Sequence, residues 1–114
     1  MFAVISAQRE MADLKYSPEA LKDLDEIWDY IYSDLCNPDA ADHTVDAILV
    51  KTESLREFPF SGAPLDTISR IHSDYRFVPA NNFLAFYRVQ DGVVYIDRIL
   101  YGRRDCLRTL LGLK

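Results

Sequence analysis

The sequence predicts an α+β fold in which a helical hairpin packs on one face of a small, mainly antiparallel sheet, in the order β-α-α-β-β-β. Two amphipathic segments with helical spacing come first along the chain, and three segments rich in aromatic and β-branched residues follow them. A grouping of helices before strands is typical of α+β proteins. The length of 114 residues fits one domain, which we expect over residues 11–114, after a flexible extension at residues 1–10.

A short alternation of apolar and polar residues at 14–16 predicts the first strand, and both helices are expected to begin at one kind of capping signal. Ser17-Pro18 and Asn37-Pro38 each combine a side-chain cap with a proline at the first helical position. Apolar residues then recur at intervals of three and four, which gives each helix one apolar face. These residues are Leu21, Leu24, Ile27, Trp28, Ile31 and Leu35 in the first helix, and Ala41, Val45, Ile48, Leu49, Thr52 and Leu55 in the second. The acidic residues of the first helix, Asp23 among them, are expected to face water.

Three strands are expected to complete the sheet after a Pro/Gly loop at residues 58–66. These strands are predicted at residues 75–78, 83–89 and 93–101. The first of them should stop at Pro79. Asn81-Asn82 and Asp91-Gly92 predict the tight turns, because Asn, Asp and Gly tolerate positive φ. A last short helix is predicted at residues 105–111.

The formal net charge of −5 combines two halves of opposite sign. Residues 1–66 carry 5 basic and 14 acidic side chains, a net charge of −9, whereas residues 67–114 carry 8 basic and 4 acidic ones, a net charge of +4. Such a division often indicates an interaction surface, although an acidic solvated layer beside a mildly basic one explains it equally well. No segment reaches the roughly 18 apolar residues that span a membrane, so we expect a cytoplasmic protein with reduced cysteines.

The candidate binding residues are arginines of the basic half, since the sequence contains no motif for a cofactor, a metal or a nucleophilic triad. They are Arg76, Arg88 and Arg98 in the predicted strands, and Arg103 and Arg104 after Gly102. Guanidinium groups beside tyrosine rings on a sheet can bind phosphates and bases, or the carboxylates of a partner peptide. An exposed sheet face also needs polar residues, which explains any single strand arginine. For the Arg103-Arg104 pair we favour a binding role.

Several segments, taken in order, carry a family resemblance. They are Tyr16-Ser17-Pro18-Glu19-Ala20, Phe58-Pro59 followed by Gly62, the strand at 83–89, the Asp91-Gly92 turn, and residues 94–105. Over residues 13–111 the chain resembles the RelE/ParE-type toxins of bacterial type II toxin–antitoxin systems, which are associated with growth inhibition and plasmid stabilisation. The resemblance implies the fold predicted above. It also implies a partner, an antitoxin encoded beside the toxin that wraps and neutralises it, and oligomers formed only through that complex.

The resemblance implies one of two activities. ParE-like members bind and inhibit DNA gyrase and are not nucleases, whereas RelE-like members cleave mRNA in the ribosome. Leu84 stands where RNA-cleaving relatives often have an arginine, and Tyr101 where many have a histidine, which favours the ParE-like branch. In the RelE-like alternative, the mRNA interferase, the catalytic residues would be Arg76, Tyr87, Tyr101 and Arg104. A third alternative is an inactive member that only binds the antitoxin.

Overall fold

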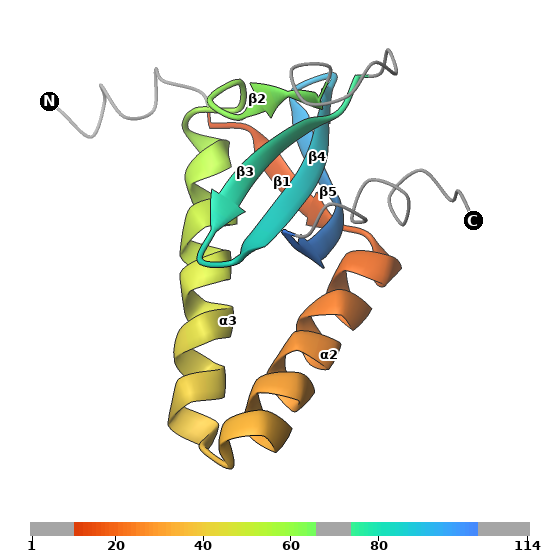
Figure 1. Ribbon diagram of the computed structural model, residues 1–114. Helices are drawn as coiled ribbons and strands as arrows, with labels where there is room; N and C mark the ends of the chain where they lie inside the picture. The colour runs from red at the N-terminus through yellow and green to blue at the C-terminus, as the bar shows by residue number, and fades with distance from the viewer. Residues whose placement is uncertain (1–10, 66–73, 103–114) are drawn as a thin grey trace, which may run out of the picture.

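The computed structural model describes residues 11–65 and 74–102 and confirms the predicted α+β class (Figure 1). α2 and α3 form a hairpin that packs on one face of a five-stranded sheet. The elements are β1 (Asp13–Tyr16), α2 (Pro18–Leu35), α3 (Pro38–Glu53), the 3₁₀ turn η1 (Ser54–Arg56), β2 (Ala63–Pro64), β3 (Arg76–Ala80), β4 (Phe83–Gln90) and β5 (Val93–Tyr101). Four predicted features lie outside the described residues: the extension at 1–10, the helix at 105–111, Arg103 and Arg104.

The strand order in the sheet is β1-β5-β4-β3-β2. β1 pairs with β5 in parallel, whereas all other neighbours are antiparallel, so the first and last strands of the described chain lie side by side. A left-handed backbone marks both predicted turns, with φ of 55° at Asn81, 53° at Asp91 and 76° at Gly92. The turn predictions are therefore confirmed. The two-residue strand β2, inside the predicted loop, was not predicted.

The prediction that the strand before the first turn stops at Pro79 is wrong. β3 continues through Pro79 to Ala80, and Pro79 lies opposite Leu84 of β4. Ala80 and Phe83 form the pair that closes the hairpin. Because hydrogen-bonded and non-hydrogen-bonded pairs alternate along an antiparallel ladder, the Pro79–Leu84 pair next to it requires no hydrogen bond. On the other side, β2 reaches only the first two residues of β3. Proline is tolerated here because its missing N–H faces an unpaired edge.

Both predicted helix starts are confirmed by their capping bonds. The Ser17 hydroxyl accepts a hydrogen bond from the backbone N–H of Ala20 at 2.9 Å and donates one to the carbonyl of Asp97 at 2.7 Å. The Asn37 side chain accepts bonds from the first turn of α3 at 3.0 and 3.2 Å. Ser17 thus caps α2 and also fixes its start against β5.

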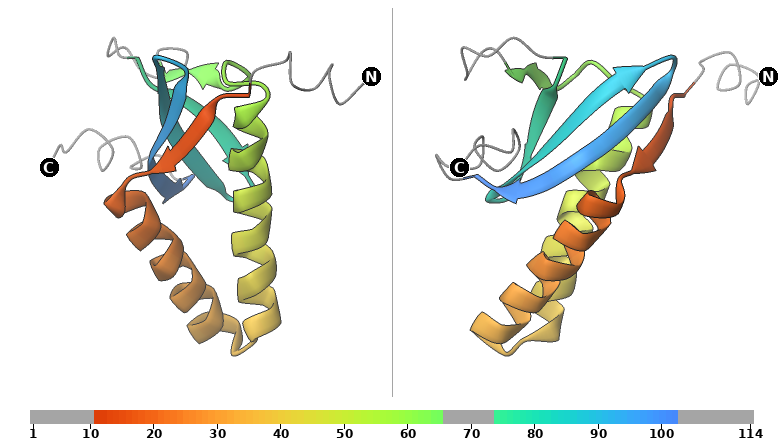
Figure 2. Two further views of the ribbon diagram at one scale, coloured as in Figure 1. Left: turned by 180° about the vertical axis from the view of Figure 1, so that it is seen from behind. Right: turned by 90° about the vertical axis from the view of Figure 1, so that its right-hand side faces the viewer.

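The predicted apolar faces are buried close to the sheet but not at the far end of the hairpin. Leu24 and Ile27 of α2 and Ile48 of α3 are buried in the main core. Leu21 and Leu35, which were predicted to be buried, are more than half exposed. For Leu35 the reason is geometric, because the hairpin extends beyond the sheet and its tip has no sheet to pack on (Figure 2).

Apolar clusters lie on both faces of the sheet. The main core fills the space between the helices and the sheet, whereas Leu65 and Phe86 are fully buried on the opposite face. Partly buried residues surround this second cluster, namely Tyr75, Phe77, Leu84 and Leu100. The face predicted to be polar therefore has an apolar centre. Among the described residues, no helix has the length and hydropathy that a membrane crossing requires.

Candidate functional site

Arg98 is held by a carboxylate of the first helix. Its Nε and Nη2 atoms donate to the Asp23 carboxylate at 2.8 and 2.9 Å, and the same carboxylate accepts the backbone N–H of Ile99 at 2.9 Å. The hydrogen bond to Asp23 raises the pKa of Arg98. The prediction that Asp23 faces water is wrong, because it is 6% exposed and ties α2 to β5.

Arg88 is also paired with a carboxylate of the chain, on the sheet face opposite the helices. Its Nε donates to the Asp97 carboxylate at 2.8 Å, and its guanidinium lies 5.5 Å from the centre of the Tyr95 ring. Burial raises the pKa of Tyr75, and the charge of Asp97 and a hydrogen bond with it raise that pKa further. The positive charge of Arg88 is therefore already matched within the chain.

Tyr87 lies in the core, and its hydroxyl both donates and accepts a hydrogen bond. The side chain is fully buried, and its hydroxyl donates to the carbonyl of Pro59 at 2.8 Å and accepts the backbone N–H of Gly62 at 2.9 Å. Burial raises the pKa of Tyr87, while the Gly62 bond and the charge of Arg76 oppose this shift. Tyr87 therefore holds a loop in place, because its hydroxyl proton is donated to a backbone carbonyl and its ring is buried.

Arg76 differs from the other two strand arginines in its partners. Its Nη1 donates to the carbonyls of Gly62 at 2.7 Å and Phe60 at 3.3 Å, and its guanidinium lies 5.1 Å from the centre of the Phe60 ring. Within residues 11–65 and 74–102, no carboxylate forms an ion pair with Arg76. Backbone carbonyls leave a guanidinium with its full charge, so Arg76 remains able to attract an anionic group.

The segment at residues 58–62, here called the aromatic loop, places two phenylalanines in water. Phe58 is 58% exposed and Phe60 is 64% exposed. The loop is nevertheless fixed, because Tyr87 bonds to two of its backbone groups and Arg76 to two others, while Ser61 N donates to the Phe58 carbonyl at 3.1 Å. The structure thus brings Arg76 and Tyr87, both predicted site residues, to the same loop.

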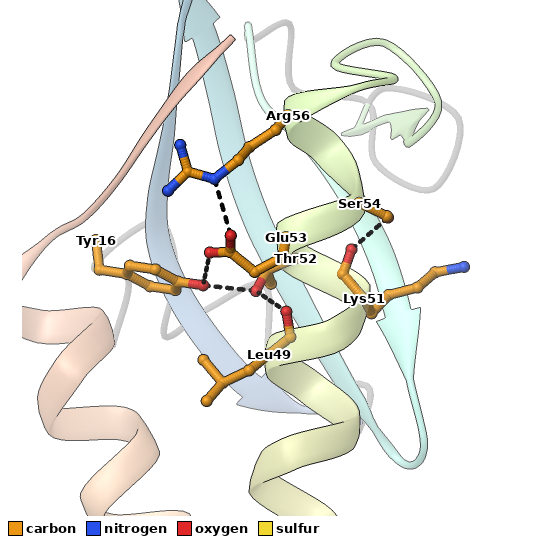
Figure 3. Close-up of polar contacts among 7 residues, drawn as sticks. All are labelled: Tyr16, Leu49, Lys51, Thr52, Glu53, Ser54 and Arg56. Atoms are coloured by element: carbon orange, nitrogen blue, oxygen red, sulfur yellow. Dashed lines mark hydrogen bonds and ion pairs between the residues drawn. The ribbon is translucent and has the colours of Figure 1, made fainter. Parts of the chain in front are cut away.

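A polar cluster fixes the chain just before the aromatic loop (Figure 3). The Tyr16 hydroxyl of β1 lies 2.7 Å from the Thr52 hydroxyl and donates to the Glu53 carboxylate at 3.4 Å. Glu53 also pairs with Arg56 at 2.8 Å, and the Arg56 carbonyl accepts the backbone N–H of Ala12 at 2.8 Å. Burial raises the pKa of Tyr16. The end of α3 is therefore tied to the N-terminal strand, and the loop that follows starts from a fixed point.

Tyr101 lies apart from this loop, at the other end of the sheet. It is 46% exposed, and its ring centre lies 5.5 Å from that of Phe83. Both residues line a cavity of about 700 Å³ between α2 and the ends of β4 and β5, and Glu26 and Asp34 also line it. The structure therefore does not bring Tyr101 together with Arg76. The predicted pair Arg103 and Arg104 lies beyond the described residues.

Sequence reasoning missed Phe58 and Phe60 as surface residues and Asp23 as a buried one. Apolar residues beside a proline in a loop were the available signal for Phe58 and Phe60, because a loop runs over the surface. For Asp23 a helical pattern gives no signal, since its partner is 75 positions away. In the part of the chain that the structure describes, no cluster of three potential metal ligands occurs.

Comparison with known proteins gives a consistent assignment. The family model described as the ParE toxin of the type II toxin–antitoxin system parDE matches residues 14–106. A chain of the chromosomal ParDE system from P. aeruginosa is 27% identical, with a TM-score of 0.69 over 82% of this chain and 98% of that one. A chain of the RelBE2 toxin–antitoxin complex from Mycobacterium tuberculosis is 18% identical, with a TM-score of 0.57 over 81% and 92%, and supports the fold alone. No curated protein matches the chain in sequence.

The hairpin, the five-stranded sheet and these matches define the class of protein as a toxin of a type II toxin–antitoxin system. Within that class, the chain belongs to the ParE toxin family, whose model covers most of its length. The resemblance to RelE/ParE-type toxins in the sequence is thereby confirmed.

Proposed function

We propose that this toxin inhibits growth in the ParE-like manner, by binding DNA gyrase, and that a cognate antitoxin neutralises it. The observation that carries the proposal is the state of the residues that a RelE-like nuclease would use. The hydroxyl of Tyr87 is buried and bonded on both sides, and Arg76 and Tyr101, the other two candidates within the described residues, lie in different parts of the molecule. RNA cleavage needs an acid and a base in reach of one phosphate.

The distribution of charge supports the same proposal. Arg88 and Arg98 were expected to attract a partner, but each is paired with a carboxylate of the chain. Binding to RNA depends mainly on phosphate contacts, and a cation with an internal partner adds little to it. Leu84, where a nuclease would place an arginine, packs into the apolar cluster of the second sheet face. A protein target is therefore favoured over RNA.

The ParE-type assignment and the ParDE match support the antitoxin partner. Since gyrase, the ribosome and mRNA all lie in the cytoplasm, we place the protein there too. We expect it to oligomerise only through its antitoxin complex.

Two assays on the purified toxin, freed from its antitoxin, test the proposed target. We expect the toxin to block supercoiling of a relaxed plasmid by gyrase and to leave mRNA intact during translation in vitro. Site-specific cuts in the mRNA that an Arg104→Ala substitution abolishes would instead establish the RelE-like activity. Absence of any effect in both assays, together with normal growth on expression, would identify an inactive member that only binds the antitoxin.

A further inference from the structure

The aromatic loop is exposed and yet rigidly supported, which is an unusual combination for two neighbouring phenylalanines. An apolar side chain left in water contributes little to folding, whereas large apolar groups gathered at a surface often mark a binding site. Phe58 and Phe60 keep more than half of their surface in solvent. A role in folding therefore does not account for their position.

The loop is held by the buried residues on either side of it in the sequence, by the strand that follows it and by Tyr87. Leu55 and Leu65, which flank it, are fully buried, and β2 pairs with β3 directly after it. From the core, Tyr87 bonds to the loop at Pro59 and Gly62. A loop held in this way loses little conformational freedom when a partner binds, and this raises affinity for a given contact area.

The charge beside the two phenylalanine rings indicates the chemistry of the partner. Arg76 lies over the Phe60 ring, and its hydrogen bonds go to backbone carbonyls. Arginine and aromatic residues, phenylalanine included, are enriched in protein–protein interfaces. A carboxylate that approaches Arg76 would gain a charge-assisted hydrogen bond, and an apolar side chain next to that carboxylate would cover the rings.

We propose that Phe58, Phe60 and Arg76 form a docking platform for an acidic segment of the antitoxin, in which an apolar side chain covers the two rings and a carboxylate binds the Arg76 guanidinium. The proposal rests on the proposed neutralisation by a cognate antitoxin, but it does not depend on gyrase as the target. It assigns to the antitoxin a contact on the loop after the second helix, in addition to the binding role that the sequence predicts for the arginine pair at 103–104.

The test measures binding of the toxin to the full-length antitoxin encoded beside its gene, by calorimetry. We expect a Phe58→Ser, Phe60→Ser double variant to bind at least about tenfold more weakly, as expected for the loss of a binding hot spot. The matched control is Leu35→Ser, since Leu35 is also more than half exposed but lies at the tip of the hairpin. The control should change the dissociation constant by less than about twofold. Both variants should melt at the wild-type temperature, because the substituted side chains are exposed, and the single variant Phe60→Ser provides a milder change.

A second variant tests the charge. Arg76→Gln should weaken binding and reduce its dependence on salt, because the lost interaction is between two charges. An unchanged dissociation constant for the double variant would overturn the proposal. If the double variant no longer inhibits gyrase but binds the antitoxin with unchanged affinity, the platform belongs to the target and the proposal is overturned. The proposal is also overturned if the wild-type toxin forms a dimer that the double variant does not form, while the affinity for the antitoxin is unchanged. If the wild type binds the antitoxin but does not inhibit gyrase, only the proposed target fails. If it binds no antitoxin, both proposals fail.

Discussion

Replacing Asp23 by alanine should destabilise the toxin more than any other change to an acidic residue of α2. The substitution removes two hydrogen bonds to Arg98 and one to the backbone of Ile99, and it leaves that buried N–H without an acceptor. Breaking a buried ion pair from one side costs about 3–5 kcal/mol. The Arg98 side chain is 28% exposed, so water can solvate it in part, and we expect a loss near the lower limit, about 3 kcal/mol. For a domain of this size, that lowers the melting temperature by about 12 °C or more.

Urea unfolding followed by circular dichroism measures this effect. Asp23→Asn keeps one acceptor for Ile99 and should cost only about 1–2 kcal/mol, the difference between a charged and a neutral acceptor. Asp25→Ala is the control, because Asp25 is exposed on the same helix, and its effect should stay within about 0.5 kcal/mol. Equal stability of the Asp23→Ala and Asp25→Ala variants would show that the pair does not hold α2 to β5.

Two further predictions concern the support of the aromatic loop. Burial raises the pKa of Tyr87, so the unfolded chain loses its tyrosine proton first, and stability should fall as the pH rises above about 10. Tyr87→Phe should reduce this alkaline loss, seen by comparing urea midpoints at pH 8 and pH 11, and should cost about 1–2 kcal/mol at pH 7 by leaving Gly62 N–H without an acceptor. Gly62→Ala should cost about 2 kcal/mol or more, because its Cβ would lie 2.5 Å from the Tyr87 hydroxyl oxygen and 2.8 Å from the Phe77 carbonyl oxygen. Thermal melting of Gly62→Ala in a Tyr87→Phe background checks this cause, since the Phe77 carbonyl remains and stability should not return.

Local chemistry made much of the fold predictable. Capping at Ser17 and Asn37 depends only on the next few residues, and so do the left-handed turns at Asn81 and Asp91. Pro79 was misread for the opposite reason. Whether a proline ends a strand depends on which neighbour lies on its N–H side, and the fact that β2 covers only the first two residues of β3 is a property of the whole topology.

The site was less predictable because the charge of Arg98 is matched by a carboxylate 75 positions away in the sequence. A register irregularity between Phe86 and Tyr87 changes the alternation of the β4–β5 ladder, so that Ile96 and Ile99 both face the main core. Arg98 then bonds to Asp23 of α2. Strict alternation of side chains along β5 does not predict this contact. The net charge of +4 in the second half of the sequence therefore counts Arg98, whose charge is already matched by Asp23 of the first half.

The carboxylate of Asp23 also acts as a substitute for a missing strand. β1 pairs with β5 only as far as Ile96, and beyond it the side chains of Ser17 and Asp23 bond to the Asp97 carbonyl and the Ile99 N–H. These groups would otherwise be free to pair with an extended chain. At the opposite side of the sheet, Pro79 offers no N–H to such a chain. The sheet is thus protected at both of these places against edge-to-edge aggregation.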